Sequence, residues 1–225
     1  MAASNNSFDL SKGTHMLALL FEVTPKRDCY QRYLDIAAAL RPALDKHDGL
    51  LFIDRYRSLS KPDTILSHSL WRDEASMAAW RTFESHHHAQ VVGREQVFAD
   101  YRLRIADVVL ARTPNASDWR PSRPSSYNEP AARPPRHVVI ATSRGTPCAG
   151  EASDRFESLN RPKEFLSLYD AGDIDAAASL LESLSNPMSG AAGPETTSVR
   201  LCELERDYGM FDRREAPQYY PPVSR

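Results

Sequence analysis

The chain has 225 residues, with 28 Lys and Arg against 30 Asp and Glu, a formal net charge of -2 and 41% hydrophobic residues. This balance argues against a nucleic-acid or anionic-membrane partner, because such binding depends on accumulated positive charge. The three cysteines share no close spacing, which argues against a disulfide framework or a zinc knuckle and for a reducing compartment. No apolar run approaches the roughly 20 residues of a membrane span. The N-terminus shows no signal-peptide pattern, and we therefore expect a cytoplasmic protein.

Residues 1–14 are predicted to be a disordered lead-in, and residues 15–112 a first folded unit. The unit opens with an apolar run typical of a buried strand, MLALLFEV. From Asp28 to His47, apolar residues recur every three or four positions, which indicates a helix. The elements that follow are a strand in HDGLLFIDRYRSL, a turn at SKPD, a strand in TILSHSLW, a helix in RDEASMAAWRTF and a strand in VFADYRLRIADVVLA. The order β-α-β-β-α-β predicts an α+β, ferredoxin-like (split βαβ) unit, an antiparallel sheet with helices on one face.

A second, shorter copy follows a proline-rich stretch. Residues 113–136 hold six prolines and almost no aliphatic residues, and are predicted to be a linker. Residues 137–225 form a predicted second, truncated ferredoxin-like unit with a C-terminal tail. Its hairpin, RFESLNRPKEFLS, repeats RYRSLSKPDTILS of the first unit one hundred residues later. The first helix has no counterpart, and we expect the bare face of one sheet to cover the other.

The first unit resembles the antibiotic biosynthesis monooxygenase (ABM) family. The similarity rests on the helix ending LRPALDKHDGLL, the strand FIDRYRSL, the strand ending in Trp71, and the following RDEASMAAW…HHH. The resemblance implies the dimeric α/β-barrel fold, formed by a homodimer or by an intrachain pseudo-dimer. It also implies a small-molecule oxygenase, because the family includes cofactor-free oxygenases of phenolic polyketides, quinol monooxygenases and haem-degrading enzymes.

Candidate substrate-binding residues lie on the strand that ends in Trp71. Period-two alternation places Ser67, Ser69 and Trp71 on one face and His68 on the other. Two small hydroxyls beside an indole suit a pocket for a flat aromatic ligand. Family members that oxidise polyketides without a cofactor carry an Asn four residues before the Trp, where this chain has Ser67. Trp80 is predicted to form a second wall of this pocket.

Candidate catalytic residues are His87 and His86, within ESHHHA. A histidine near the pocket mouth is a feature of the resemblance, and its ordinary pKa near 6.5 suits acid–base work at neutral pH. Three successive helical residues point about 100° apart and cannot converge on one metal ion, so we expect no metal site. Arg55 recurs as Arg155, which suggests a structural ion pair.

The leading prediction is therefore an enzyme, a cofactor-independent monooxygenase that oxidises a small phenol, quinol or polyketide-like aromatic with O2. Ionising a phenol of pKa about 10 at pH 7 costs roughly 4 kcal/mol, so a base and hydrogen-bond donors in a dry pocket are required. Chemistry is expected in the first unit only, since Ala171 and Leu180 replace Trp71 and Trp80 in the second copy.

Two alternatives remain open. The first is a haem-binding or haem-degrading monooxygenase, because the spacing of Trp71 and Trp80 also occurs in the haem branch. That branch places its haem-ligating His where this chain has Gln90, although His87 lies one helical turn earlier. The second is a non-catalytic ligand-binding or assembly protein that keeps the fold. The aromatic C-terminal tail suits either a cover over a barrel mouth or a contact with another subunit.

Overall fold

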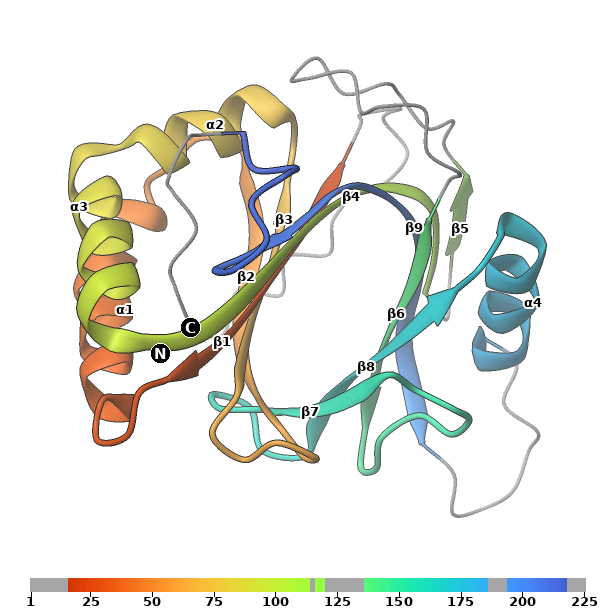
Figure 1. Cartoon of the computed structure of the whole chain (residues 1–225). Helices are drawn as coiled ribbons and strands as arrows, with labels where there is room; N and C mark the ends of the chain where they lie inside the picture. The colour runs from red at the N-terminus through yellow and green to blue at the C-terminus, as the bar shows by residue number, and fades with distance from the viewer. Residues whose placement is uncertain (1–15, 114–115, 120–135, 186–193, 218–225) are drawn as a thin grey trace.

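The computed structural model describes residues 16–113, 116–119, 136–185 and 194–217 (Figure 1). Its first unit has the predicted order of elements with one addition, a separate helix before the last strand. Phe83 takes an extended backbone conformation that ends the second helix, and the chain then starts a new one. The elements are β1 (Leu17–Pro25), α1 (Tyr30–Leu44), β2 (Leu50–Ser58), β3 (Ile65–Trp71), α2 (Glu74–Thr82), α3 (Glu84–Val92), the π-helical turn η1 (Gly93–Val97) and β4 (Phe98–Thr113).

The second unit repeats this plan without the first helix. A loop of residues 145–153 stands where the first unit has α1. The elements are β6 (His137–Arg144), β7 (Asp154–Ser158), β8 (Glu164–Ala171), α4 (Ile174–Ser185) and β9 (Glu195–Gly209). A short strand, β5 (Ala116–Trp119), pairs with β4 inside the segment predicted as linker. The predicted lead-in, residues 1–14, and residues 114–115 and 120–135 of that linker lie outside the described residues.

The two units form one closed antiparallel barrel. The strands neighbour one another in the order β1-β3-β2-β7-β8-β6-β9-β4, and β4 pairs with β1 to close the ring. Helices α1, α2 and α3 cover the outside of the first unit, and α4 covers the second (Figure 1). The predicted α+β, ferredoxin-like fold of barrel type is confirmed. The described strands build the intrachain pseudo-dimer, because each unit's bare sheet face points into the shared interior.

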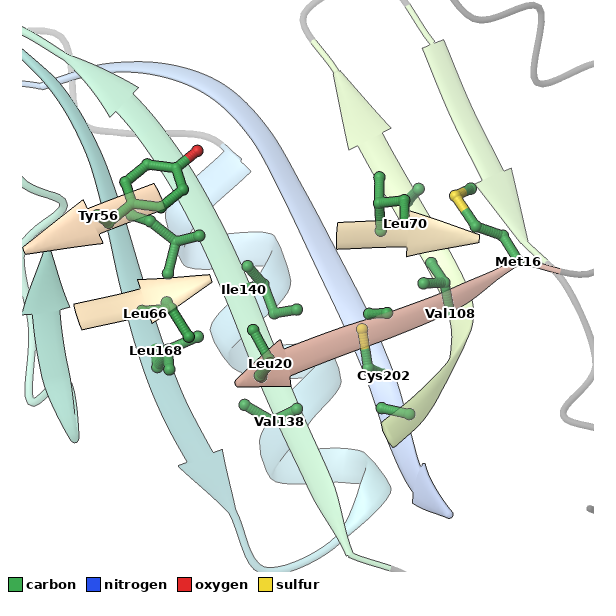
Figure 2. Packing of buried hydrophobic residues seen from close by; sticks show 14 of the residues in the cluster. Met16, Leu20, Tyr56, Leu66, Leu70, Val108, Val138, Ile140, Leu168 and Cys202 are labelled. Atoms are coloured by element: carbon green, nitrogen blue, oxygen red, sulfur yellow. The ribbon is translucent and has the colours of Figure 1, made fainter. Parts of the chain in front are cut away.

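The barrel interior is filled by alternate residues of strands from both units. Leu20 and Leu66 come from the first unit, and Ile140 and Leu168 from the second, and their side chains face one another across the barrel (Figure 2). All four are at most 1% exposed. This shared core makes the two units mutually dependent, since neither sheet could expose such a face to water without a large loss of hydrophobic stabilisation. Within the described residues, no helix is long and apolar enough to cross a membrane.

The seam between β2 and β7 is held by a buried carboxylate that reaches from one unit to the other. Asp54, 4% exposed, accepts hydrogen bonds from the Ser158 hydroxyl at 2.7 Å, the Asn160 amide at 2.7 Å and the Arg161 guanidinium at 2.8 Å. Burial alone would raise the pKa of Asp54, but these bonds lower it below the ordinary value. The side chain is therefore an ionised, fully bonded anion at neutral pH.

The second unit makes the equivalent contact in the opposite direction, from its own aspartate to the hairpin of the first unit. Asp154, 7% exposed, accepts from the Ser58 hydroxyl at 2.9 Å and the Ser60 hydroxyl at 2.8 Å, and Lys61 lies 3.9 Å away. Ser58 also accepts from the backbone N–H of Lys61, which closes its own turn. We call these reciprocal contacts of Asp54 and Asp154 the aspartate clasp. It explains why the motif Ser-Leu, a polar residue, a cation and Pro occurs in both hairpins.

Replacing either aspartate of the clasp is expected to destabilise the whole barrel. Asp54→Ala leaves the Ser158 and Arg161 donors without their acceptor and should cost about 2–4 kcal/mol of unfolding free energy. Asp154→Ala should cost somewhat less, because its cation is more distant. Urea denaturation measures both. Asp63→Ala, in the same hairpin but exposed, is the control and should change stability by at most about 0.5 kcal/mol. Equal effects of Asp54→Ala and Asp63→Ala would rule the clasp out.

Candidate active site

A cavity of about 220 Å³ lies between the outer face of the first sheet and its three helices. Most of its wall is apolar, with Leu19 and Ile105 on the sheet side and Leu40 and Met77 on the helix side. All helices and β1–β4 of the first unit contribute residues to its wall. The second unit contributes Tyr208 at the end of β9 and Arg213 just beyond it.

Strand β3 presents the predicted substrate-binding residues to this cavity. Ser67, Ser69 and Trp71 line it, whereas His68 is 1% exposed inside the barrel. The Trp71 indole N–H donates to the Ser69 hydroxyl at 2.9 Å, so the hydroxyl hydrogen of Ser69 points elsewhere. Trp80 of α2 also lines the cavity. The structure thus brings together in one cavity wall all four residues that we predicted from the sequence to bind the substrate.

His68 belongs to the barrel core. Its Nδ1 lies 3.2 Å from the Leu19 carbonyl oxygen. Burial, reinforced by the Arg200 charge, lowers the pKa of His68 to about 3. The ring is neutral at physiological pH and has no access to the cavity.

His86 is the cavity histidine. Its ring stacks on Trp80 with centroids 4.6 Å apart, and its Nδ1 lies 2.9 Å from the Trp80 carbonyl oxygen. Since a carbonyl only accepts, Nδ1 carries the hydrogen and Nε2 is the acceptor. Burial lowers the pKa of His86 to about 4, against the opposing effect of the Trp80 carbonyl. The imidazole is therefore neutral at pH 7.

The structure separates the predicted pair of histidines. His87 is exposed on the outer side of α3 and does not line the cavity. Its prediction as first-choice base is not supported by this position, because adjacent helical residues point about 100° apart and only one of them can face inward. Gln90, one turn after His86, lines the cavity and donates to the Arg81 carbonyl at 2.9 Å.

Four arginines in the cavity wall were not predicted as site residues. Arg55, Arg81, Arg94 and Arg213 line the cavity, and among the described residues no Asp, Glu or Lys does. Alternation along β2 could have placed Arg55 there, since Asp54 faces the barrel and the next residue must face the helices. Nothing in the sequence places the other three beside it.

Arg55 and Arg155, its counterpart in the second unit, make different contacts. Arg55 bonds the buried Tyr33 hydroxyl; burial raises the pKa of Tyr33, and the guanidinium opposes that shift. Arg155 donates to the backbone carbonyls of Cys148, at 3.1 Å, and Gly150. Among the described residues, these contacts of the two arginines are hydrogen bonds and not the predicted structural ion pair. Arg55 lines the first-unit cavity.

Comparison with known proteins identifies the family. The family described as "Antibiotic biosynthesis monooxygenase" matches residues 16–92. A protein named jasmonate monooxygenase ABM, from Pyricularia oryzae, is 36% identical over 216 residues, which cover 93% of this chain and 100% of that protein. The chain belongs to the ABM family. It is an enzyme, an oxidoreductase of the monooxygenase type.

Solved structures of similar shape are more distant from this ABM monooxygenase. An anthrone oxidase-like protein shares 10% identity, with a TM-score of 0.41, and covers 92% of this chain and 98% of its own. A monooxygenase-like protein from Fusobacterium nucleatum shares 8% identity, with a TM-score of 0.41, over 86% of this chain and 94% of its own. With TM-scores below 0.5, the family assignment rests on the sequence relative.

The ligands in the cavity wall of this ABM protein do not suit a protein-bound metal ion. Among the described residues the wall offers one imidazole, that of His86, and no thiol or carboxylate, whereas such metal sites use several ligands of these kinds; a haem iron needs only one axial imidazole, so only the volume bears on haem. Across the described residues, no cluster of three His, Cys, Asp or Glu could hold an ion. The volume lies below the 300–1,000 Å³ usual for drug-sized ligands, and a haem is larger still. Gln90 occupies the position of the haem ligand and is bonded to the backbone.

The neutral state of His86 predicts a pH dependence of stability. The folded pKa is about 4 and the ordinary value 6.5, so the unfolded chain binds the proton more tightly. Stability due to His86 is therefore present above pH 6.5 and lost as the pH falls toward 4. Relative to a His86→Phe variant, which retains the stack on Trp80, the natural protein should lose about 1–3 kcal/mol across that window.

Chemical denaturation at pH 7, 6, 5 and 4.5 measures this difference. Glu205, whose pKa burial raises to about 7, acts in the opposite direction between pH 4.5 and 7, but it is common to both proteins and cancels. His87→Phe, on the exposed side of the same helix, is the matched control and should follow the natural protein at every pH. A constant difference between the natural protein and His86→Phe would show that His86 is not held neutral by the fold.

Proposed function

We propose that the protein is a monooxygenase that oxidises a small, mostly apolar organic anion with O2 in the first-unit cavity. The observation that carries the proposal is the make-up of the described part of the wall, in which every residue charged at neutral pH is an arginine and the remainder is largely apolar. Such a site favours a ligand with one anionic oxygen group and a hydrocarbon body. Jasmonate, the compound in the relative's name, is a cyclopentanone acid of this kind.

The wall favours stabilisation of an anion over proton abstraction by a base. The pKa of His86, about 4, lies about six units below that of a phenol, so transfer of a phenolic proton to this imidazole costs roughly 8 kcal/mol. Guanidinium groups in a water-poor cavity instead stabilise a negative oxygen directly. In this proposal His86 Nε2 and the Ser69 hydroxyl orient the substrate, and Trp71 and Trp80 hold its flat part.

The proposal includes no resident cofactor. The electrons that reduce O2 must therefore come either from the substrate alone or from the substrate together with an added reductant. When a substrate methylene becomes a carbonyl, the substrate supplies all four electrons that O2 needs, and one oxygen atom leaves as water. When a C–H bond becomes C–OH, two of the electrons and two protons come from an added reductant. The expected products are therefore 14 or 16 mass units heavier than the substrate.

A substrate panel tests this function. Purified protein is incubated in air with jasmonate, methyl jasmonate, simple phenols and quinols, with and without ascorbate. O2 uptake and the product masses are then followed, with 18O2 as label. We expect 18O in the product from at least one anionic substrate, and a loss of at least tenfold in turnover for Trp71→Ala. Hemin is added separately, and a Soret shift at one equivalent would favour the haem alternative. The absence of O2 uptake across the panel, with ligands nevertheless bound, would contradict the oxidation of a small organic anion in this cavity.

A further inference from the structure

Three neighbouring polar side chains, each from a different element, face the first-unit cavity together. Arg55 of β2 and Ser67 of β3 are register partners, and both line the cavity, so their Cβ atoms lie about 5 Å apart on one face of the sheet. Tyr33 of α1, the helix over that face (Figure 1), also lines the cavity, and its hydroxyl accepts a hydrogen bond from the Arg55 guanidinium. We call these three residues the polar triad.

Each member of the polar triad can donate a hydrogen bond to a ligand. Burial raises the pKa of Tyr33, so its hydroxyl keeps its hydrogen at neutral pH. Because the Tyr33 oxygen accepts from Arg55, that hydrogen is left for another acceptor. The Ser67 hydroxyl is a donor that rotates to suit its partner. Among the described residues of the wall there is no carboxylate to take these hydrogens or to neutralise Arg55.

The surroundings of the triad are apolar. The row that Arg55 and Ser67 begin continues across the sheet with Phe21 of β1 and Leu103 of β4, since Phe21 pairs with Ser67 on one side and with Leu103 on the other. Both side chains line the cavity. Apolar neighbours reduce screening by water, so the Arg55 charge attracts a bound anion more strongly here than at the surface.

The geometry of Arg55 favours a single anionic oxygen over a carboxylate. Carboxylates bind arginine most firmly through a fork of two parallel N–H groups. The Nε of Arg55 is buried and has no acceptor among the described residues, so a fork that includes Nε is closed to a ligand. The bond to Tyr33 takes a further N–H. The remaining guanidinium N–H, together with the Tyr33 and Ser67 hydroxyls, forms a set of donors suited to one oxygen atom.

Provided that the first-unit cavity is the substrate site, as proposed above, we propose that Arg55, Tyr33 and Ser67 bind the substrate through one anionic oxygen, that of an ionised phenol or enol. The hydroxyl hydrogen of the substrate passes to water, so no protein base is required. A positive charge beside the oxygen favours its ionised form and lowers the pKa of the bound hydroxyl. The triad thus holds the substrate in its electron-rich state.

Ionisation of a bound dye tests the triad apart from turnover. 4-Nitrophenol is yellow only when ionised, and its electron-poor ring resists oxidation. The dye is titrated with the full-length protein between about pH 5 and 9, where the arginines stay charged and His86, with a pKa of about 4, stays neutral. We expect the pKa of the bound dye to fall by about one unit or more, which corresponds to at least tenfold tighter binding of the phenolate than of the phenol.

Variants assign the shift to the triad. Arg55→Gln should abolish it, Arg55→Lys should keep part of it, and Tyr33→Phe should weaken binding of the phenolate about tenfold. Arg57→Gln changes the next residue on the same face of β2, whose side chain is 51% exposed, and should match the natural protein. 4-Nitroanisole, the methyl ether without an ionisable hydrogen, shows whether each cavity is intact and should bind all variants within about twofold.

Four results would overturn the triad. The first is failure of 4-nitrophenol to bind the natural protein, and the second is binding without a shift of its pKa. The third is a shift that persists in Arg55→Gln and disappears in Arg94→Gln or Arg213→Gln, which would place the oxygen at another arginine. The fourth is 4-nitrobenzoate binding as tightly as the phenolate with the same dependence on Arg55, which would contradict the preference for a single oxygen.

The triad and the proposed function can fail separately. Labelled product from the substrate panel, together with an unshifted dye, would leave the monooxygenase function standing and remove the triad. A shifted dye that depends on Arg55, without O2 uptake from any substrate, would support the triad and contradict the proposed function.

Discussion

Closure of the barrel within one chain is the constraint on which the rest of the structure depends. Two ferredoxin-like sheets with bare faces must cover each other, and they do so by joining edges at β2–β7 and β4–β9. The β2–β7 seam is short, with three register pairs. It is there that each unit places a buried aspartate against the hydroxyl and cation donors of the other. A charge-assisted contact of this kind is directional, so it specifies the alignment of the two hairpins as well as holding them together.

The β4–β9 seam brings residues of the second unit into the wall of the first unit's cavity. Because β9 of the second unit lies along β4 of the first, its end reaches the wall of the first unit's cavity. Strand pairing therefore places Tyr208 there, and the chain just beyond β9 adds Arg213. In the described part of the C-terminal segment, up to residue 217, Arg213 lines this cavity on the outer face of the sheet. A cover over a barrel mouth and a contact with another subunit both stay predictions for the tail.

Duplication left the two units unequal in the helices that cover their sheets among the described residues. The first unit has three helices over its sheet, and the gap beneath them is walled by Trp71 and Trp80. The second has α4 alone, whose Ala177 and Leu181 pack against Val139 and Tyr169 in a buried apolar cluster. With Ala171 and Leu180 at the positions of the two tryptophans, this unit provides support and closure. Its Asp154 and its β9 explain why it is retained in the chain.

Local patterns in the sequence determined the order of the elements and the face of each strand on which a side chain lies, because side-chain direction alternates regularly along a strand or helix. Period-two alternation along β3 assigned Ser67, Ser69 and Trp71 to one face and His68 to the other. The repeat one hundred residues apart predicted two matching hairpins. Only the tertiary structure decided that His86 faces the cavity while His87 faces water, since that depends on the rotation of α3 after the break at Phe83. The clasp of Asp54 and the placing of Tyr208 beside β4 in the cavity wall were likewise beyond sequence reasoning. These contacts join residues about a hundred positions apart, and their geometry exists only once the barrel has closed.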